Sequence, residues 1–143
     1  YRISLLGGGS DLDWFVEREN YGNSIGYTLN KFSYSILNVL ENKNNYGILN
    51  YSSRERYFNI ESIVHPLIRE TLIHFNIRKP IELSTFGFAS GGSGLGGSSS
   101  FILSFIAAIS EYKSLKKSLM DQASLSCEIE INNKENNLGR QDQ

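Results

Sequence analysis

A run of glycine and serine between two apolar segments limits the folds open to this chain more than any other feature. The run extends from Ser90 to Ser100, follows a strand-like segment, Ile81 to Phe88, and leads directly into an apolar segment that predicts a helix. A glycine-rich turn at this place leaves backbone N–H groups at the positive end of the helix dipole, where they can bind phosphate. Glycine also lets a phosphate approach the backbone closely. The run therefore predicts a nucleotide-binding site.

Three other interpretations of this run agree less well with its surroundings. Glycine- and serine-rich segments are often flexible linkers, but both flanks are apolar and periodic, and Leu95 interrupts the glycines. A Walker A loop requires Gly-Lys-Ser/Thr, which the run lacks. The spacing of Gly92, Gly94 and Gly97 matches a dinucleotide-binding fingerprint. That motif also needs an acid about twenty residues later, and the acid there, Glu111, lies inside a predicted helix.

Composition excludes several classes of function. The 143 residues are 40% hydrophobic and 20% charged, which is enough for one domain with a core. The net charge is −1, so we expect neither a nucleic-acid nor a membrane partner. A single cysteine, Cys127, allows no disulfide within the chain and favours the reducing cytoplasm. Since the chain starts at Tyr1 without methionine and stops at Gln143 after a polar turn, we expect a fragment truncated at both ends.

The pattern of apolar residues predicts a mixed order of strands and helices. Apolar residues recur at helical spacing from Ile60 to Phe75, and Pro66 lies early enough in this segment to be tolerated. The other predicted helices are Ser98 to Tyr112 and Ser118 to Ile131, with a short helix or irregular segment at Asp11 to Glu17. The predicted strands are Arg2 to Leu6, Ser24 to Leu29, Ser33 to Leu40, Tyr46 to Tyr51, Glu55 to Phe58 and Ile81 to Phe88.

Two further segments carry residue types suited to catalysis. Near the N-terminus, Arg2 begins a strand that ends in three glycines, followed by Ser10 and Asp11. Near the C-terminus, Glu130 ends a predicted helix and Asp142 follows a polar loop. Carboxylates are ligands for Mg²⁺ and can accept the proton of a hydroxyl group. Taken alone, the first segment is more simply a capped turn and the second a solvated helix end.

Together, the three segments resemble the GHMP kinases, small-molecule kinases that include galactokinase, homoserine kinase and mevalonate kinase. The sugar-kinase branch containing D-glycero-D-manno-heptose 7-phosphate kinase is the most similar. Its Arg-Ile-Ser-x-x-Gly-Gly-Gly-Thr-Asp start is similar to Arg2 to Asp11, with Ser10 in place of threonine. Its Gly-x-Gly-Leu-Gly-Ser-Ser-Ser-Ser-Phe loop is similar to Gly92 to Phe101, with Gly97 in place of one serine.

The remaining parts of the resemblance lie in the middle and at the end of the chain. The branch's His-x-Glu-Ile and Gly-Lys-Gln-Asp-Gln segments are similar to Glu128 to Ile131 and Gly139 to Gln143, and His65 to Glu70 also resembles the branch. Galactokinases carry Gly-Glu-His-Thr-Asp where this chain has Gly7 to Asp11, so galactose is not the expected substrate.

The resemblance implies an α+β fold with a mixed β-sheet, helices on one side and a left-handed βαβ crossover. It implies that residues 1–143 are the N-terminal, ATP-binding domain of the family and that the C-terminal domain is absent from the chain. It also implies ATP and Mg²⁺ as cofactors and a small-molecule sugar or sugar phosphate as partner. The resemblance does not predict an oligomeric state.

The resemblance also implies a role for each matching residue. Ser98 and Glu130 would hold Mg²⁺, Asp142 would accept the proton of the attacking hydroxyl, and a nearby cation, Arg2, would keep that acid ionised. The residues that would bind the sugar are Gly8, Gly9, Ser10 and Asp11. The residues that would bind the ATP phosphates are Gly92, Ser93, Gly94, Leu95, Gly96, Gly97, Ser98, Ser99 and Ser100.

The activity implied by the resemblance is ATP-dependent phosphorylation of a sugar or sugar phosphate, at the anomeric hydroxyl of D-glycero-D-manno-heptose 7-phosphate. One alternative is a kinase of the same family for another substrate, such as fucose or a mevalonate-type alcohol. A second is a nucleotide-binding module without catalysis, and a third is a structural domain with a glycine–serine linker.

Overall fold

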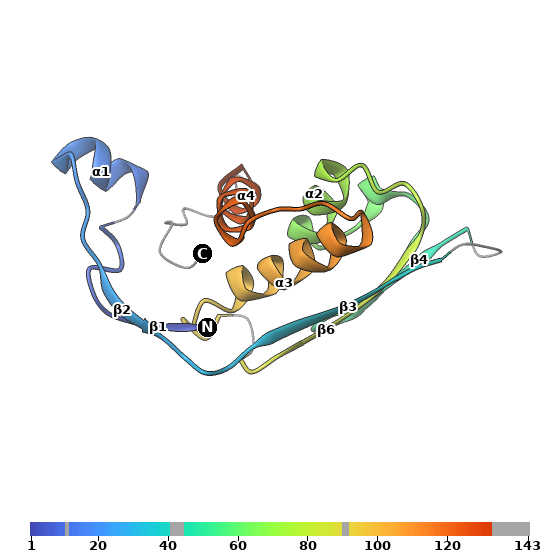
Figure 1. The fold of residues 1–143 in the computed structure, drawn as a ribbon, viewed down its shortest axis with the longest axis horizontal. Helices are drawn as coiled ribbons and strands as arrows, with labels where there is room; N and C mark the ends of the chain where they lie inside the picture. The colour runs from blue at the N-terminus through green and yellow to red at the C-terminus, as the bar shows by residue number, and fades with distance from the viewer. Residues whose placement is uncertain (11, 41–44, 90–91, 133–143) are drawn as a thin grey trace.

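A four-stranded mixed sheet and a separate two-stranded ribbon organise the chain in the computed structural model (Figure 1), which describes residues 1–10, 12–40, 45–89 and 92–132. In the ribbon, β1 (Arg2–Leu6) pairs antiparallel with β2 (Ile25–Thr28), and α1 (Asp13–Glu19) lies between them in the sequence. The sheet has the order β3-β6-β4-β5. Its strands are β3 (Ser33–Val39), β4 (Gly47–Asn50), β5 (Arg54–Tyr57) and β6 (Ile81–Gly87).

One pair of neighbouring strands in the sheet is parallel, and the other two pairs are antiparallel. β6 pairs antiparallel with β3 and parallel with β4, where Leu49 lies opposite Leu83. Parallel neighbours require a crossover connection. Here it runs through β5, a 3₁₀ turn η1 (Ile60–Ser62) and α2 (Pro66–His74). The predicted mixed sheet is confirmed, whereas the left hand of the crossover stays a prediction.

Three helices cover one face of the sheet, as predicted: α2, α3 (Gly97–Tyr112) and α4 (Leu119–Asn132) (Figure 1). The side chains that α3 buries completely recur at positions i, i+3, i+4 and i+7, so they share one helix face. They are Ile102, Phe105, Ile106 and Ile109. Each stabilises the fold by about 1.5–3 kcal/mol relative to an exposed side chain. This apolar face therefore fixes the rotation of α3 about its axis.

The single helix predicted for Ile60 to Phe75 is wrong in extent. The structure has the 3₁₀ turn η1 first, and α2 begins only at Pro66. A proline disfavours helical backbone at the preceding residue, and His65 is accordingly extended, with φ −72° and ψ 109°. Proline then occupies the first helical position, where its missing N–H costs no hydrogen bond. His65 consequently lies at the entrance to α2 rather than inside a helix.

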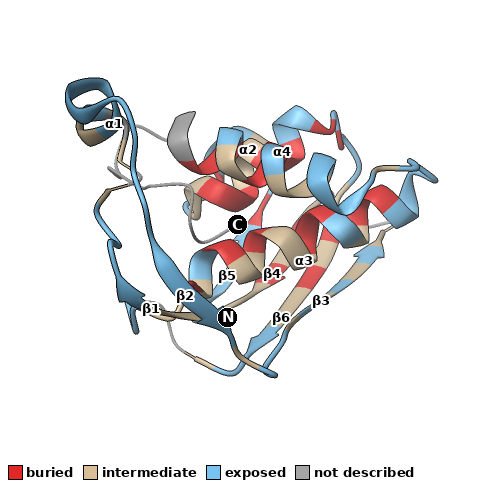
Figure 2. Ribbon diagram, turned by 60° about the vertical axis from the view of Figure 1, so that its left-hand side comes forward, coloured by how far each residue is buried: buried red, intermediate tan, exposed pale blue. Residues whose placement is uncertain are grey.

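The other predicted elements agree with the structure to within two residues at each end, including the short helix α1. Buried residues concentrate in β4, β6, α2, α3 and α4, whereas α1 and β2 are largely exposed (Figure 2). Within the described ranges, no helix combines the length and the apolar character needed to cross a membrane.

Candidate active site

The glycine-rich loop between β6 and α3 has a backbone conformation that favours glycine. Gly92, Gly94 and Gly96 have φ values of 78°, 71° and 68°, in the left-handed region that other residues rarely adopt. A Cβ atom added to Gly92 or Gly94 would meet no other described atom within 4 Å, so backbone conformation rather than crowding requires glycine there. Gly96 is the N-cap of α3 and supplies no side-chain cap. The first turn of α3 is therefore suited to bind an anion through its backbone N–H groups.

Arg2 connects the N-terminal strand to this loop. Its backbone N–H donates to the carbonyl oxygen of Leu95 over 3.1 Å, and its guanidinium Nη1 donates to the carbonyl oxygen of Gly94 over 3.0 Å. The structure thus brings together two predicted site segments that are 92 residues apart in the sequence. A positive charge lies beside the loop, where it would complement a bound phosphate.

Glu130 of α4 lies against the first turn of α3. Its Oε2 accepts a hydrogen bond from the Ser99 hydroxyl over 2.8 Å, and both residues are only 1% exposed. Ser98, which the sequence resemblance pairs with Glu130, is exposed. Consecutive residues of a helix point about 100° apart, so the buried face that holds Ser99 at Glu130 turns Ser98 to the surface. Among the described residues, Ser99 rather than Ser98 makes the hydrogen bond to Glu130.

The donor set at this point fits a hard cation. Carboxylate and hydroxyl oxygens are Mg²⁺ ligands, and Mg²⁺ at nucleotide sites usually takes one or two carboxylates together with phosphate oxygens. A carboxylate as buried as Glu130 is costly unless hydrogen bonds or a cation compensate its charge. Within the described ranges, no cluster of three or more His, Cys, Asp or Glu residues forms a complete metal site. Phosphate oxygens would therefore have to supply further ligands.

The predicted sugar-binding segment forms a turn that is stabilised by the Ser10 hydroxyl group. The backbone N–H of Ser10 donates to the carbonyl oxygen of Gly7 over 2.9 Å, and its Oγ lies 2.8 Å from the same oxygen and 2.6 Å from that of Asn23. Gly8 and Gly9 are exposed in this turn. Ser10 therefore has a structural role whether or not it contacts a substrate. Asp11 and Asp142 lie outside the described residues.

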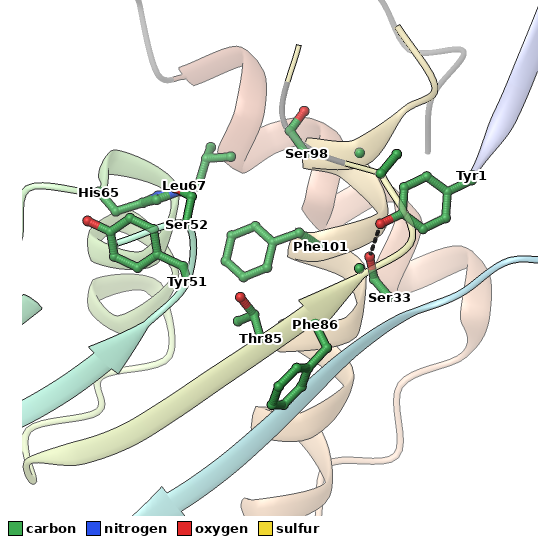
Figure 3. Close-up of a pocket in the computed structure, with 13 residues that line it drawn as sticks. Tyr1, Ser33, Tyr51, Ser52, His65, Leu67, Thr85, Phe86, Ser98 and Phe101 are labelled. Atoms are coloured by element: carbon green, nitrogen blue, oxygen red, sulfur yellow. Dashed lines mark hydrogen bonds between the residues drawn. The ribbon is translucent and has the colours of Figure 1, made fainter. Parts of the chain in front are cut away.

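A cavity of about 460 Å³ opens next to the first turn of α3 (Figure 3). Ser98 and Gly97 line one part of it. An aromatic row lines another part: Tyr51 follows β4, His65 precedes α2, and Phe101 belongs to α3. The ring centroids of Tyr51 and His65 lie 4.9 Å apart, and those of His65 and Phe101 lie 5.5 Å apart.

The aromatic row was not predicted as part of the site. Its members come from three separate segments, and no local motif joins them. The one available signal was that His65 to Glu70 resembles a segment of the family. A cavity with mainly apolar walls and a few polar groups is typical of small-molecule sites.

Glu55 of β5 hydrogen-bonds Tyr51, which lines the cavity, and the residue that precedes His65. Its Oε2 accepts a hydrogen bond from the Tyr51 hydroxyl over 3.1 Å, and its Oε1 accepts one from the backbone N–H of Val64 over 2.7 Å. Burial lowers the pKa of His65 below its ordinary value of 6.5, and the nearby charge of Glu55 opposes this shift only in part. His65 is therefore neutral at pH 7.

Comparisons with known proteins support a family assignment. Residues 59–143 match the family model described as the GHMP kinases N terminal domain. The chain also resembles a solved structure named as a D-glycero-D-manno-heptose 1-phosphate kinase from Bacteroides thetaiotaomicron, with TM-score 0.83 and 24% identity, covering 99% of this chain and 49% of that one. A second solved structure, described as a sugar kinase from Campylobacter jejuni, gives TM-score 0.71 and 24% identity and covers 99% of this chain and 46% of that one.

At this level of identity, the two solved structures establish the shared fold. The chain spans about half the length of each. Comparison with curated protein sequences gave no match.

Proposed function

The chain belongs to the GHMP kinases, and from this premise we propose that it forms part of an enzyme that transfers a phosphoryl group from ATP to a hydroxyl group of a small sugar or sugar phosphate. Arg2, the glycine loop and Glu130 come from three distant parts of the sequence and meet around the first turn of α3. This meeting of a cation, backbone donors and a buried carboxylate is the main support for the proposal, because phosphoryl transfer depends mainly on positioning and charge neutralisation.

In this proposal the glycine loop and the first turn of α3 bind the phosphates of ATP, and the cavity beside Ser98 accommodates the nucleoside. Glu130 and Ser98 would hold Mg²⁺ when it is bound, with Ser99 orienting the Glu130 carboxylate. The metal would supply charge neutralisation on the phosphate oxygens. Arg2 would add a second positive charge next to the loop.

The transfer itself requires an acceptor oxygen and a base. The sugar hydroxyl oxygen forms a bond to the γ-phosphorus, the bond from that phosphorus to the oxygen bridging to ADP breaks, and the hydroxyl proton passes to Asp142. We propose Asp11, with Gly8, Gly9 and Ser10, as the residues that bind the sugar. These roles come from the sequence resemblance.

For the acceptor we propose the anomeric hydroxyl of D-glycero-D-manno-heptose 7-phosphate. The sequence resemblance supports this choice, and the fold shared with two proteins named as sugar kinases agrees with a sugar acceptor. We propose further that residues 1–143 are the ATP-binding part of a longer, cytoplasmic protein. The chain's coverage of about half of each related structure supports a second domain that completes the site.

ADP release by the full-length protein tests this proposal. The assay would use Mg-ATP with fucose, mevalonate and heptose 7- and 1-phosphates as acceptors. We expect release that depends on heptose 7-phosphate and falls about 100-fold or more in Asp142→Asn, because a general base contributes 10²–10⁴-fold. Glu128→Gln, at an exposed position of α4, is the control and should retain activity.

Each other outcome has a distinct meaning. ADP release that requires fucose or mevalonate would indicate a kinase of the same family with a different substrate. Binding of Mg-ATP without release for any acceptor would favour a nucleotide-binding module. Full activity in Asp142→Asn would exclude the proposed base.

A further inference from the structure

His65 occupies a position in the cavity wall where its nitrogens are not needed for packing. Its ring makes edge-on contacts with Tyr51 on one side and Phe101 on the other, at interplanar angles of 82° and 66°. A phenylalanine ring would make the same contacts. The imidazole nitrogens therefore need an explanation apart from the aromatic row.

Hydrogen bonds within the described structure do not supply that explanation. Nδ1 of His65 is buried and has no hydrogen-bond partner among the described residues. Glu55 is the nearby carboxylate, but its two oxygens accept hydrogen bonds from the Tyr51 hydroxyl and the Val64 N–H. A buried polar atom without a partner lowers stability, so an imidazole lowers stability at this position where a phenylalanine would not. A function of its other nitrogen, Nε2, would explain why histidine is present.

The chemistry of His65 suits recognition of a neutral polar group. Burial keeps its pKa below 6.5, so at pH 7 the ring offers hydrogen bonding and no charge. Because Nδ1 is enclosed, Nε2 is the nitrogen left to a ligand in the cavity. In a neutral imidazole Nε2 donates or accepts one hydrogen bond, according to the tautomer.

The position of the cavity indicates which part of a ligand reaches His65. Ser98 and Gly97, which line the same cavity, belong to the first turn of α3, where the proposed function places the phosphates. In a nucleotide bound there, the planar base is the part that can extend from the phosphates to the aromatic row. The edge of a nucleobase carries ring nitrogens and exocyclic groups that form hydrogen bonds.

We propose that His65 is a specificity-determining residue of the nucleotide site, whose Nε2 hydrogen-bonds the polar edge of the base while Tyr51 and Phe101 hold the imidazole in place. This inference rests on the proposed function, because it takes the ligand to be a nucleotide. Glu55 is a positioning residue in this arrangement, since it orients Tyr51 and the segment that leads into His65.

Calorimetric binding of two ligands to the full-length protein separates the base from the phosphates. The ligands are Mg-ATP and Mg-tripolyphosphate, which lacks the nucleoside. His65→Phe keeps the ring contacts and removes both nitrogens. We expect it to raise the Kd of Mg-ATP about five- to tenfold, the effect of one lost hydrogen bond, and to leave the Kd of tripolyphosphate unchanged. The melting temperature should not fall, because the unpartnered Nδ1 is removed.

Two variants make the test specific. His65→Gln restores a polar group near the position of Nε2 and should recover part of the affinity for Mg-ATP. His74→Phe changes an exposed histidine at the end of α2, the helix that His65 precedes, and His74 does not line the cavity. This variant should change neither Kd.

Three results would overturn the inference without contradicting the proposed function. One is an unchanged Kd of Mg-ATP in His65→Phe. Another is an equal loss for both ligands, which would show a structural effect on the phosphate site. The third is wild-type protein that binds tripolyphosphate as tightly as Mg-ATP, in which case the phosphate site stands and the role of His65 fails. Wild-type protein that binds neither ligand would contradict the proposed function itself, and the inference would fall with it.

Discussion

Ser98 and Ser99 are neighbours in the sequence but have different surroundings in the structure. Ser99 is buried and donates to Glu130, whereas Ser98 is exposed at the cavity. The two hydroxyls can therefore divide two tasks, with Ser99 holding the carboxylate and Ser98 facing a bound phosphate or metal.

The negative charge of Glu130 can be tested by a substitution that keeps the shape of the side chain. Glu130→Gln keeps the size of the side chain and an oxygen that can accept from Ser99, but it removes the negative charge. We expect the Mg²⁺ concentration required for half-maximal ADP release to rise about tenfold or more, since changes in the ligand environment of a metal cost 10–100-fold in affinity. Direct titration of Mg²⁺ in the presence of ADP would measure the same change without turnover.

Glu128→Gln is the matched control for this prediction, because Glu128 is exposed on the same helix α4. It removes the same charge two residues away and should leave the Mg²⁺ requirement unchanged. Equal shifts in both variants would mean that the general electrostatic field of α4, rather than a ligand at Glu130, is responsible.

Among the secondary-structure elements, the junction between the glycine-rich loop and α3 depends on both backbone conformation and side-chain packing. Three glycines with positive φ shape the loop, and the apolar stripe of α3 fixes the helix against the sheet. Hydrogen bonds from Arg2 attach the ribbon strand β1 to the loop. The loop that leads into α3, which we propose as the phosphate site, is therefore held by β1 through Arg2 and by the packed helix that follows it.

Gly94 tests the conformational requirement of this junction. Gly94→Ala introduces no close contact with the described residues, but its φ of 71° is unfavourable for alanine by about 1–2 kcal/mol. We expect the free energy of unfolding to fall by this amount or the loop to change conformation, and binding of Mg-ATP to weaken by about tenfold in the second case. Denaturant unfolding and calorimetry measure the two effects.

Gly9→Ala is the control for Gly94→Ala. A Cβ at Gly9 also meets no described atom within 4 Å, and its φ lies outside the positive region. It should leave stability and Mg-ATP binding nearly unchanged. Equal effects of the two substitutions would contradict the view that backbone conformation is what Gly94 provides.

For the whole molecule, the environment of His65 makes stability depend on pH. Because the pKa of His65 in the folded protein lies below 6.5, the unfolded chain binds a proton at this residue at a higher pH than the folded protein does. The unfolded state therefore holds more protons in the window below about pH 6.5. The stability contributed by neutral His65 is complete above that pH and is lost as the pH falls through the folded-state pKa.

Denaturant unfolding between pH 7.5 and pH 5.5 measures this effect. We expect the free energy of unfolding of the wild-type protein to decrease below about pH 6.5, and His65→Phe to reduce this decrease. His74→Phe should retain the wild-type dependence on pH, since His74 is exposed. An unchanged slope in His65→Phe would show that other groups cause the pH dependence.

Local sequence was sufficient for much of the fold. Alternation and helical spacing depend on neighbouring residues alone, so strands such as β3 and β6 and the helix α3 were predicted almost to their ends. Proline and glycine act locally as well. Pro66 disfavours helical backbone at His65, and the prediction of one long helix did not take this local effect into account.

The order of the strands and α-helices and the position of the glycine-rich loop follow from the sequence alone, because a positive φ and an apolar stripe are properties of short segments. Tertiary structure decided which side chains meet. The buried face of α3 selects Ser99 rather than Ser98 for Glu130, and Arg2 reaches Gly94 only because β1 lies beside the loop. The aromatic row around His65 likewise forms where three separate segments pack together, a proximity that no local pattern encodes.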